Sequence, residues 1–155
     1  MVDNVAITPG SGADIAADEV ASVFYQRVKA AFGPDGVAAQ AVSLFRSIDL
    51  DETEEEVKAT AGIVYWVHAV NLSTADRFVK LYNAPAASVT VGTTVPVMTI
   101  PLGYGSLDSS MASAVNLRIE ADFDTGISIA CTTGIADNDT GAPAANDVVV
   151  NVGYL

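Results

Sequence analysis

The stretch VNLRIEADF, residues 115–123, decides the fold class of this chain because apolar and polar side chains alternate along it without interruption. One set is apolar and consists of Leu117, Ile119, Ala121 and Phe123. The other set is polar and consists of Asn116, Arg118, Glu120 and Asp122. A period of two residues is that of a β-strand, whose successive side chains point to opposite faces of a sheet. The stretch therefore predicts a strand with one face on a core and the other in solvent.

Further strands are predicted on both sides of this stretch. They are VFYQRVKAAFG (23–33), RFVKLYN (77–83), PVMTIPL (96–102), GISIACTT (126–133), DVVVNVGYL (147–155) and the second half of 37–50. Pro96 and Pro101 confine their strand to a sheet edge or themselves to the ends of the strand, since proline donates no ladder hydrogen bond. Residues 57–72 are interpreted as one long or bent strand with a bulge or bend at Gly62. The acidic run 51–56 is interpreted as a solvated loop and strand edge.

About eight strands, no long helix and frequent turn signals predict an all-β protein. We expect an antiparallel β-sandwich of the jelly-roll type, with an immunoglobulin-like sandwich as the alternative. Residues 1–22 show no period long enough to fold alone, so they are predicted to form an extended N-terminal arm. Residues 23–155 are predicted to form a single sandwich domain, a size that can bury a core.

The charge balance limits the classes of partner. The 155 residues include 7 Lys and Arg against 19 Asp and Glu, for a formal net charge of −12. Nucleic acids and anionic membranes are therefore not expected as partners, because phosphate contacts need clustered basic side chains. Residues 1–12 have neither a basic nor an apolar segment of the signal-peptide kind, so synthesis in a cytoplasm is expected.

The loop DNDTGAPAAND, residues 137–147, contains three candidate ion ligands, Asp137, Asp139 and Asp147. A calcium loop needs oxygen ligands at alternate positions and a closing glutamate. Here TGAPAAN follows Asp139 and no glutamate closes the loop. Asp, Asn, Gly and Pro between two strands are also typical of turns. We predict a turn at the rim of the sandwich, with an ion site as the alternative.

Other candidate catalytic groups are few. His68, the single histidine, is predicted to be hydrogen-bonded at a sheet surface or subunit contact, because no nucleophile motif accompanies it. Cys131, the single cysteine, is predicted to be a small buried thiol. Glu120 and Asp122 share a strand face and could in principle act as paired carboxylates in a groove, but no aromatic sugar platform is expected beside them. The sequence therefore predicts no enzyme, no metal and no cofactor.

Two parts of the chain resemble small virion proteins of tailed bacteriophages. The first part carries ITPGSGA (7–13), the pair Asp18-Glu19, YQRVK (25–29) and GPDG (33–36). The second carries VKLYN (79–83), a VGT..P turn (91–96), TIP (99–101), TGI (125–127) and DVVVN (147–151), in that order. Together the two parts cover roughly two-thirds of the chain.

The resemblance implies a capsid decoration, or cement, protein that binds the outer surface of the phage head. Its expected partners are the major capsid protein and further copies of itself in a homodimer or homotrimer. The expected interface residues of the arm are Val5, Ile7, Pro9, Tyr25 and Gln26, since an ordered strand can add to a sheet of a partner. The expected location is the capsid exterior, after assembly in the host cytoplasm. Two alternatives stay open: a fibre adhesin module that binds the host surface, and a capsule- or cell-wall-degrading hydrolase.

Overall fold

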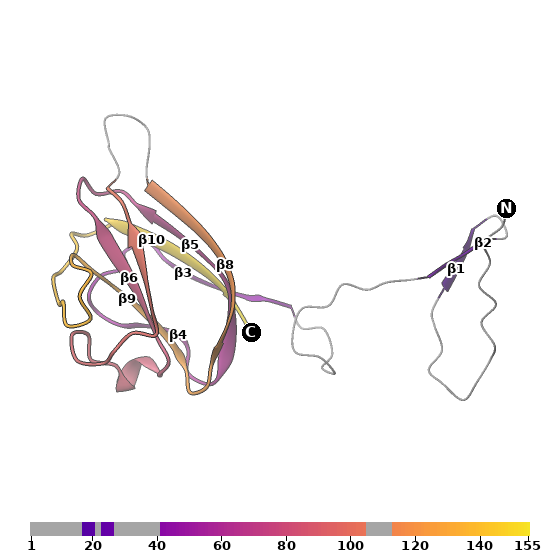
Figure 1. The fold of residues 1–155 in the computed structure, drawn as a ribbon, viewed down its shortest axis with the longest axis horizontal. Coiled ribbons are helices and arrows are strands. Elements are labelled where there is room, and N and C mark those ends of the chain that lie inside the picture. The colour runs from indigo at the N-terminus through magenta and orange to yellow at the C-terminus, as the bar shows by residue number, and fades with distance from the viewer. Residues whose placement is uncertain (1–16, 21–22, 27–40, 105–112) are drawn as a thin grey trace.

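The computed structural model describes residues 17–20, 23–26, 41–104 and 113–155, and the regular secondary structure of these residues is almost entirely β-strand (Figure 1). One 3-10 helix, η1 (Ala86–Ser88), lies in the loop between the sixth and seventh strands. The strands are β1 (Ala17–Val20), β2 (Val23–Gln26), β3 (Ser43–Ser47), β4 (Glu55–Lys58), β5 (Gly62–Asn71), β6 (Arg77–Tyr82), β7 (Met98–Leu102), β8 (Ser113–Phe123), β9 (Ile127–Thr132) and β10 (Val148–Tyr154).

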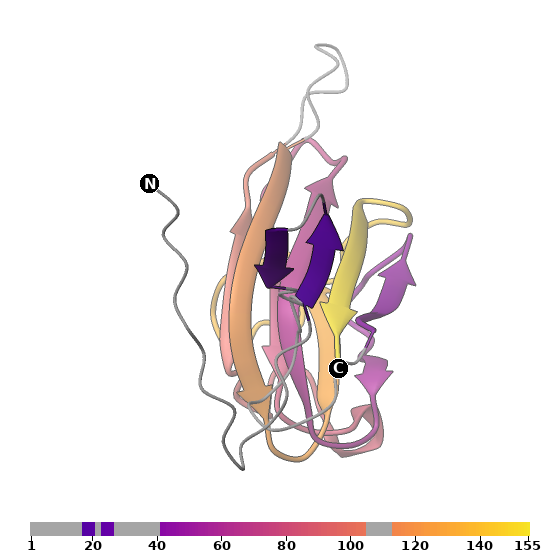
Figure 2. The same cartoon turned by 90° about the vertical axis from the view of Figure 1, so that its right-hand side faces the viewer.

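Strands β3 to β10 form two antiparallel four-stranded sheets. Their strand orders are β3-β10-β5-β8 and β4-β9-β6-β7, and Figure 2 shows the first sheet in front. Strands equally far from the β6–β7 connection are neighbours: β6 with β7, β5 with β8, β4 with β9, and β3 with β10. This is the order of one long hairpin folded over into two sheets, the arrangement of a jelly roll. The predicted antiparallel sandwich is confirmed.

The core lies between the two sheets and is made of aliphatic side chains. The alternation that predicted β8 is present in the structure, because Leu117, Ile119 and Ala121 pack against the core and Phe123 is buried in it. The fully buried members from other strands include Val64, Val67, Val79, Leu81, Ile127, Ile129, Val148, Val150 and Val152. Cys131 is also buried in this cluster, as predicted. Of the two alternatives for 96–102, the structure shows the edge position, since β7 is the last strand of its sheet, with Pro101 opposite Phe78.

The prediction of one long strand over 57–72 was wrong. Residues 57 and 58 end β4, and Gly62 begins β5, which belongs to the other sheet. Both segments carry inward apolar side chains, Val57 in β4 and Val64 in β5, so a local pattern cannot reveal that the chain changes sheets between them. The irregularity expected at Gly62 occurs near Tyr65 instead.

Strand β9 is buried on both faces. Ile127, Ile129 and Cys131 face the core, and the alternate residues Ser128, Ala130 and Thr132 are buried as well. A second small apolar cluster of Tyr82, Val89 and Ala130, with Ala84 and Val91, covers this outer side. The loop that follows β6 therefore covers the outer face of the second sheet at β9.

Strands β1 and β2 form a two-stranded antiparallel hairpin, with Asp18 opposite Tyr25 and Ala17 opposite Gln26. The predicted boundary between arm and body, after residue 22, falls between these two strands. Val5, Ile7 and Pro9 of the predicted interface lie outside the described residues. Among the residues that are described, no helix has the length and apolar character needed to cross a membrane.

Candidate functional site

An irregularity in β5 brings two aromatic side chains to the outer face of the first sheet. Val64 and Val67 are both buried, at 0% and 1% exposure, so two residues separate consecutive inward positions instead of one. The register shifts at this point against both β8 and β10. Inward residues of a regular strand recur at every second position, so the two intervening residues, Tyr65 and Trp66, share the outer side.

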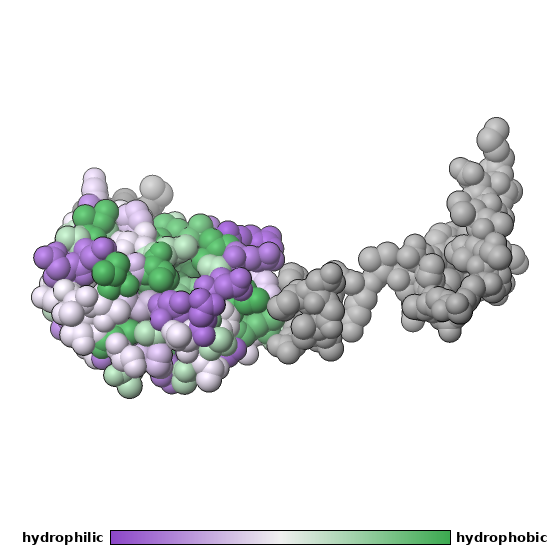
Figure 3. Space-filling view, turned by 60° about the horizontal axis from the view of Figure 1, so that its bottom comes forward, coloured by the Kyte–Doolittle hydropathy of each residue, from purple (hydrophilic) through white to green (hydrophobic). Residues whose placement is uncertain are grey.

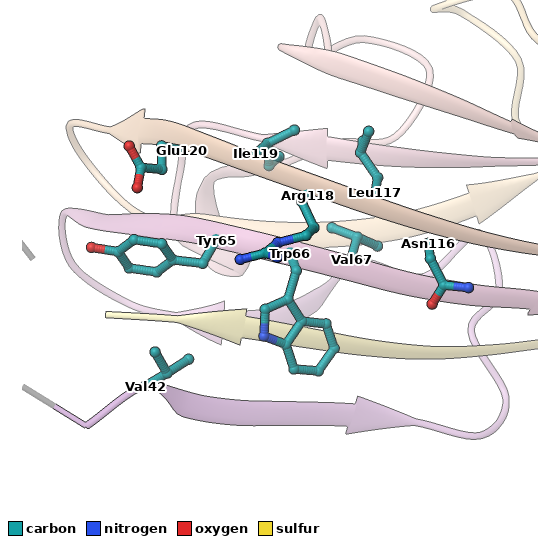
Figure 4. A pocket seen from close by; sticks show the side chains of 9 residues that line it. All are labelled: Val42, Tyr65, Trp66, Val67, Asn116, Leu117, Arg118, Ile119 and Glu120. Carbon is teal, nitrogen blue, oxygen red and sulfur yellow. The ribbon is translucent and has the colours of Figure 1, made fainter. Parts of the chain in front are cut away.

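These rings line a hollow of about 700 Å³ on that face, which we call the outer-face hollow. Figure 4 shows its lining residues: Val42, Tyr65, Trp66, Val67, Asn116, Leu117, Arg118, Ile119 and Glu120. A neighbouring hollow of about 330 Å³ is lined by Leu44, Phe45, Arg46, Trp66, His68 and Asn151. Trp66 belongs to both, so the two hollows meet at its indole ring.

Trp66 is held against the sheet by the absence of a side chain on the neighbouring strand. Its cross-strand partner in β10 is Gly153. A Cβ atom at position 153 would overlap the indole ring at Nε1 and Cε2. The indole therefore lies directly on the backbone of β10.

Polar groups from β8 border the aromatic rings. Asn116, Arg118 and Glu120 are outward residues of β8 and are exposed. In Figure 4 the Arg118 side chain extends across β5 toward Trp66. Nδ1 of His68 lies 3.4 Å from Nδ2 of Asn151, and His68 is partly exposed and lines the second hollow, so it lies at the sheet surface as predicted. The site offers a cation, an anion and amide groups around an aromatic centre.

The expectation that no aromatic platform accompanies Glu120 was wrong. Tyr65 and Trp66 line the same hollow as Glu120, whereas Asp122 does not line it. The expectation failed because strand pairing, not sequence proximity, places residues 65 and 66 beside residue 120.

The loop 137–147 is tied together by its own carboxylates. The Asp139 carboxylate accepts hydrogen bonds from the amides of Gly134 and Gly141, at 2.9 and 3.0 Å. The Asp147 carboxylate accepts from Nε and Nη2 of Arg77, at 3.0 and 2.6 Å, and from the amide of Ala144. Such side-chain-to-backbone bonds are those of a turn.

Lys80 of β6 also holds this loop in place, through hydrogen bonds from its ammonium group. Its side chain is fully buried, and Nζ donates to the carbonyl oxygen of Ala136 at 2.6 Å. The carbonyl of Asp139 lies 3.4 Å from the same atom. The alternative of an ion site stays without support, since no group of three or more His, Cys, Asp or Glu within the described residues is placed to bind a metal.

Two buried groups in the second sheet have altered acidity. Desolvation by burial raises the pKa of the Cys131 thiol from 9.0 to about 12. Burial, with a smaller contribution from the charges of Asp137 and Glu54, raises the pKa of Tyr82 to about 12. The Cys131 thiol is therefore protonated at neutral pH and poorly nucleophilic.

Of the predicted interface residues, the structure describes only Tyr25 and Gln26, both in β2. The residues that sequence reasoning missed are Tyr65, Trp66 and Arg118. The available signal was the adjacent pair Tyr65-Trp66 within a strand, together with the outward set of 113–123. Searches against protein-family models, curated proteins and solved structures find no match to this chain.

Proposed function

We propose that this chain is a bacteriophage capsid decoration protein, which binds the outer surface of the head and stabilises contacts between capsomers without catalysis. The observation that carries the proposal is apolar surface on a strongly acidic body. Leu44, Val95, Val97, Tyr104 and Ile135 are each more than half exposed. On the face that Figure 3 shows, patches of hydrophobic residues lie between hydrophilic ones. Exposed apolar patches on a folded domain are typical of surfaces that bind other proteins.

The body suits a scaffold role because its buried polar groups hold its own loops. The side-chain amide nitrogen of Asn71 donates to the carbonyl oxygens of Ala75 and Gly103, both at 2.9 Å. Lys80 and Asp139 similarly fasten the loop 137–147. A domain whose loops are already held in place can bind a partner at little further cost in conformational entropy.

The N-terminal region would supply a second contact with the capsid, in addition to the apolar surface of the body. Val5, Ile7 and Pro9 would add an extended strand to the major capsid protein, and Tyr25 and Gln26 would extend this interface. Several arms in a homodimer or homotrimer would bind with avidity. The net charge of −12 would favour basic patches on the capsid exterior.

A binding assay on purified, undecorated heads tests the proposal. We expect the full chain to decorate heads in many copies, and deletion of residues 2–22 to reduce decoration strongly while the body stays folded. A second deletion, of residues 2–16, keeps β1 and β2 and separates their contribution from that of the preceding residues. Decoration by the 2–22 deletion as strong as by the full chain would contradict the role of the arm. Failure of the full chain to bind heads would contradict the function.

The outer-face hollow favours one alternative, a head- or tail-fibre adhesin module that binds the host surface. Copy number per virion separates the two functions. Cryo-EM density at regular positions over the whole head supports decoration, whereas a few copies at a fibre or tail support an adhesin.

A further inference from the structure

We propose that the outer-face hollow is a binding site for a neutral oligosaccharide. The proposal goes beyond capsid decoration and does not depend on it, because it rests on the lining of the hollow alone. Trp66 and Tyr65 supply apolar surface, and Asn116, Arg118 and Glu120 supply hydrogen bonds at the border.

The aromatic centre fits the C–H face of a sugar ring. One face of a pyranose presents several C–H groups, which pack against the π-face of an indole, while its hydroxyl groups point outward at the ring edge. Trp66 offers such a surface because its ring lies against the backbone at Gly153 and cannot sink further into the sheet. An aromatic ring held in place on a sheet loses little conformational entropy when a ligand binds.

The polar border fits the hydroxyl groups. The carboxylate of Glu120 accepts hydrogen bonds, the guanidinium of Arg118 donates them, and the amide of Asn116 does both. These three residues occupy alternate positions of β8, so neighbours along the strand are about 7 Å apart. A row of donors and acceptors beside an aromatic ring matches a ligand that carries hydroxyls along its edge.

Charge selects a neutral ligand. Arg118 and Glu120 contribute one positive and one negative charge to the outer-face hollow, so these two charges balance, and Arg46 adds one positive charge at the second hollow. The chain as a whole carries −12, so its long-range field repels polyanions such as phosphate-rich or uronic-acid polymers.

Size favours more than one sugar unit. The hollow of about 700 Å³ falls within the range of small-molecule sites. The second hollow shares Trp66 with it and is bordered by Arg46, His68 and Asn151. An oligosaccharide could therefore cross the sheet from β8 toward β3 with one ring on Trp66.

The test uses the full chain and a panel of short neutral oligosaccharides of glucose, galactose and N-acetylglucosamine. Trp66 is the single tryptophan, so its fluorescence reports directly on the site. We expect at least one oligosaccharide to change the emission in a saturable way, with calorimetry giving the same affinity. No saturable change with any member of the panel overturns the proposal, as does tighter binding of an acidic oligosaccharide.

Variants then locate the binding, measured by calorimetry. We expect Trp66→Ala to abolish it, and the isosteric Glu120→Gln to weaken it by about tenfold or more. Tyr104→Ala removes an exposed aromatic residue that does not line the hollow and should leave affinity unchanged. Circular dichroism shows whether each variant is folded. If Trp66→Ala does not fold, Glu120→Gln still tests the proposal, because residue 120 is exposed and its substitution should not disturb the core. Unchanged affinity in Glu120→Gln, or equal losses in Tyr104→Ala, would overturn the assignment.

Discussion

Trp66 and Gly153 are cross-strand partners in β5 and β10, and the indole ring of Trp66 occupies the space that a side chain at position 153 would need. The contact fixes the aromatic centre of the outer-face hollow. It also makes residue 153 a place where the geometry of the hollow can be changed without removing any of its functional groups.

Gly153→Ala is therefore expected to push the Trp66 indole outward. The emission of Trp66 should shift to longer wavelength, because the ring becomes more exposed to water, and stability should fall by about 1–3 kcal/mol. Fluorescence and urea unfolding measure the two effects. Gly103→Ala is the matched control, since its Cβ would meet only Ser113 Oγ, at 3.6 Å. An unshifted emission in Gly153→Ala would show that the ring does not rest on β10.

Lys80→Met is expected to destabilise the domain and release the loop 137–147. The change removes the buried donor to the carbonyl of Ala136 and leaves that oxygen without this partner. The expected loss is about 1–3 kcal/mol in urea unfolding, with faster amide exchange in the loop. Lys58→Met changes a partly exposed lysine in another strand and should have a smaller effect. Equal losses in both variants would argue against a special role for Lys80.

Alkaline pH is expected to destabilise the protein through Cys131. The pKa of this thiol is about 12 in the folded state against 9.0 for a free thiol. Its contribution to stability is complete below about pH 9 and is lost as the pH rises toward 12, since only the unfolded state then ionises. The pH dependence of urea unfolding, compared between the native chain and Cys131→Ala, measures the contribution of the Cys131 thiol to the free energy of unfolding. A thiol reagent at about pH 8 should modify the native thiol only after unfolding; rapid modification of the folded protein would contradict its burial.

Tyr82→Phe is expected to leave stability unchanged or raise it by up to about 1 kcal/mol. Tyr82 is fully buried, and its hydroxyl has no hydrogen-bond partner within the described residues. Removing a buried hydroxyl without a partner removes a desolvation cost. Thermal unfolding measures the change, with Tyr104→Phe at an exposed tyrosine as the control. A loss of more than about 1 kcal/mol would mean that the hydroxyl makes a stabilising hydrogen bond.

Much of the fold could be predicted because strand faces follow a two-residue period. The stretch 115–123 predicted both the strand β8 and its inward residues, and the edge position of β7 is one of the two alternatives that the prolines at 96 and 101 left open. The pattern failed at 57–72, where consecutive strands with similar inward residues belong to different sheets. The turn predicted for 137–147 agrees with the bonds that Asp139 and Asp147 make.

The candidate site could not be predicted in the same way. Trp66, Arg118 and Gly153 lie in three strands that are far apart in sequence, and the hollow exists only where β5 pairs with β8 and β10. The sequence did contain the pair Tyr65-Trp66, but a regular strand would have sent the two rings to opposite faces.

The sequence by itself determined which side chains of each strand are apolar and hence which face of the strand is buried, because alternation is a local property of an extended backbone. Tertiary structure alone decided which strands are neighbours and where β5 departs from regular alternation. Those choices depend on contacts between distant segments, and these contacts place Tyr65 and Trp66 together beside Arg118 and Glu120 on one outer face.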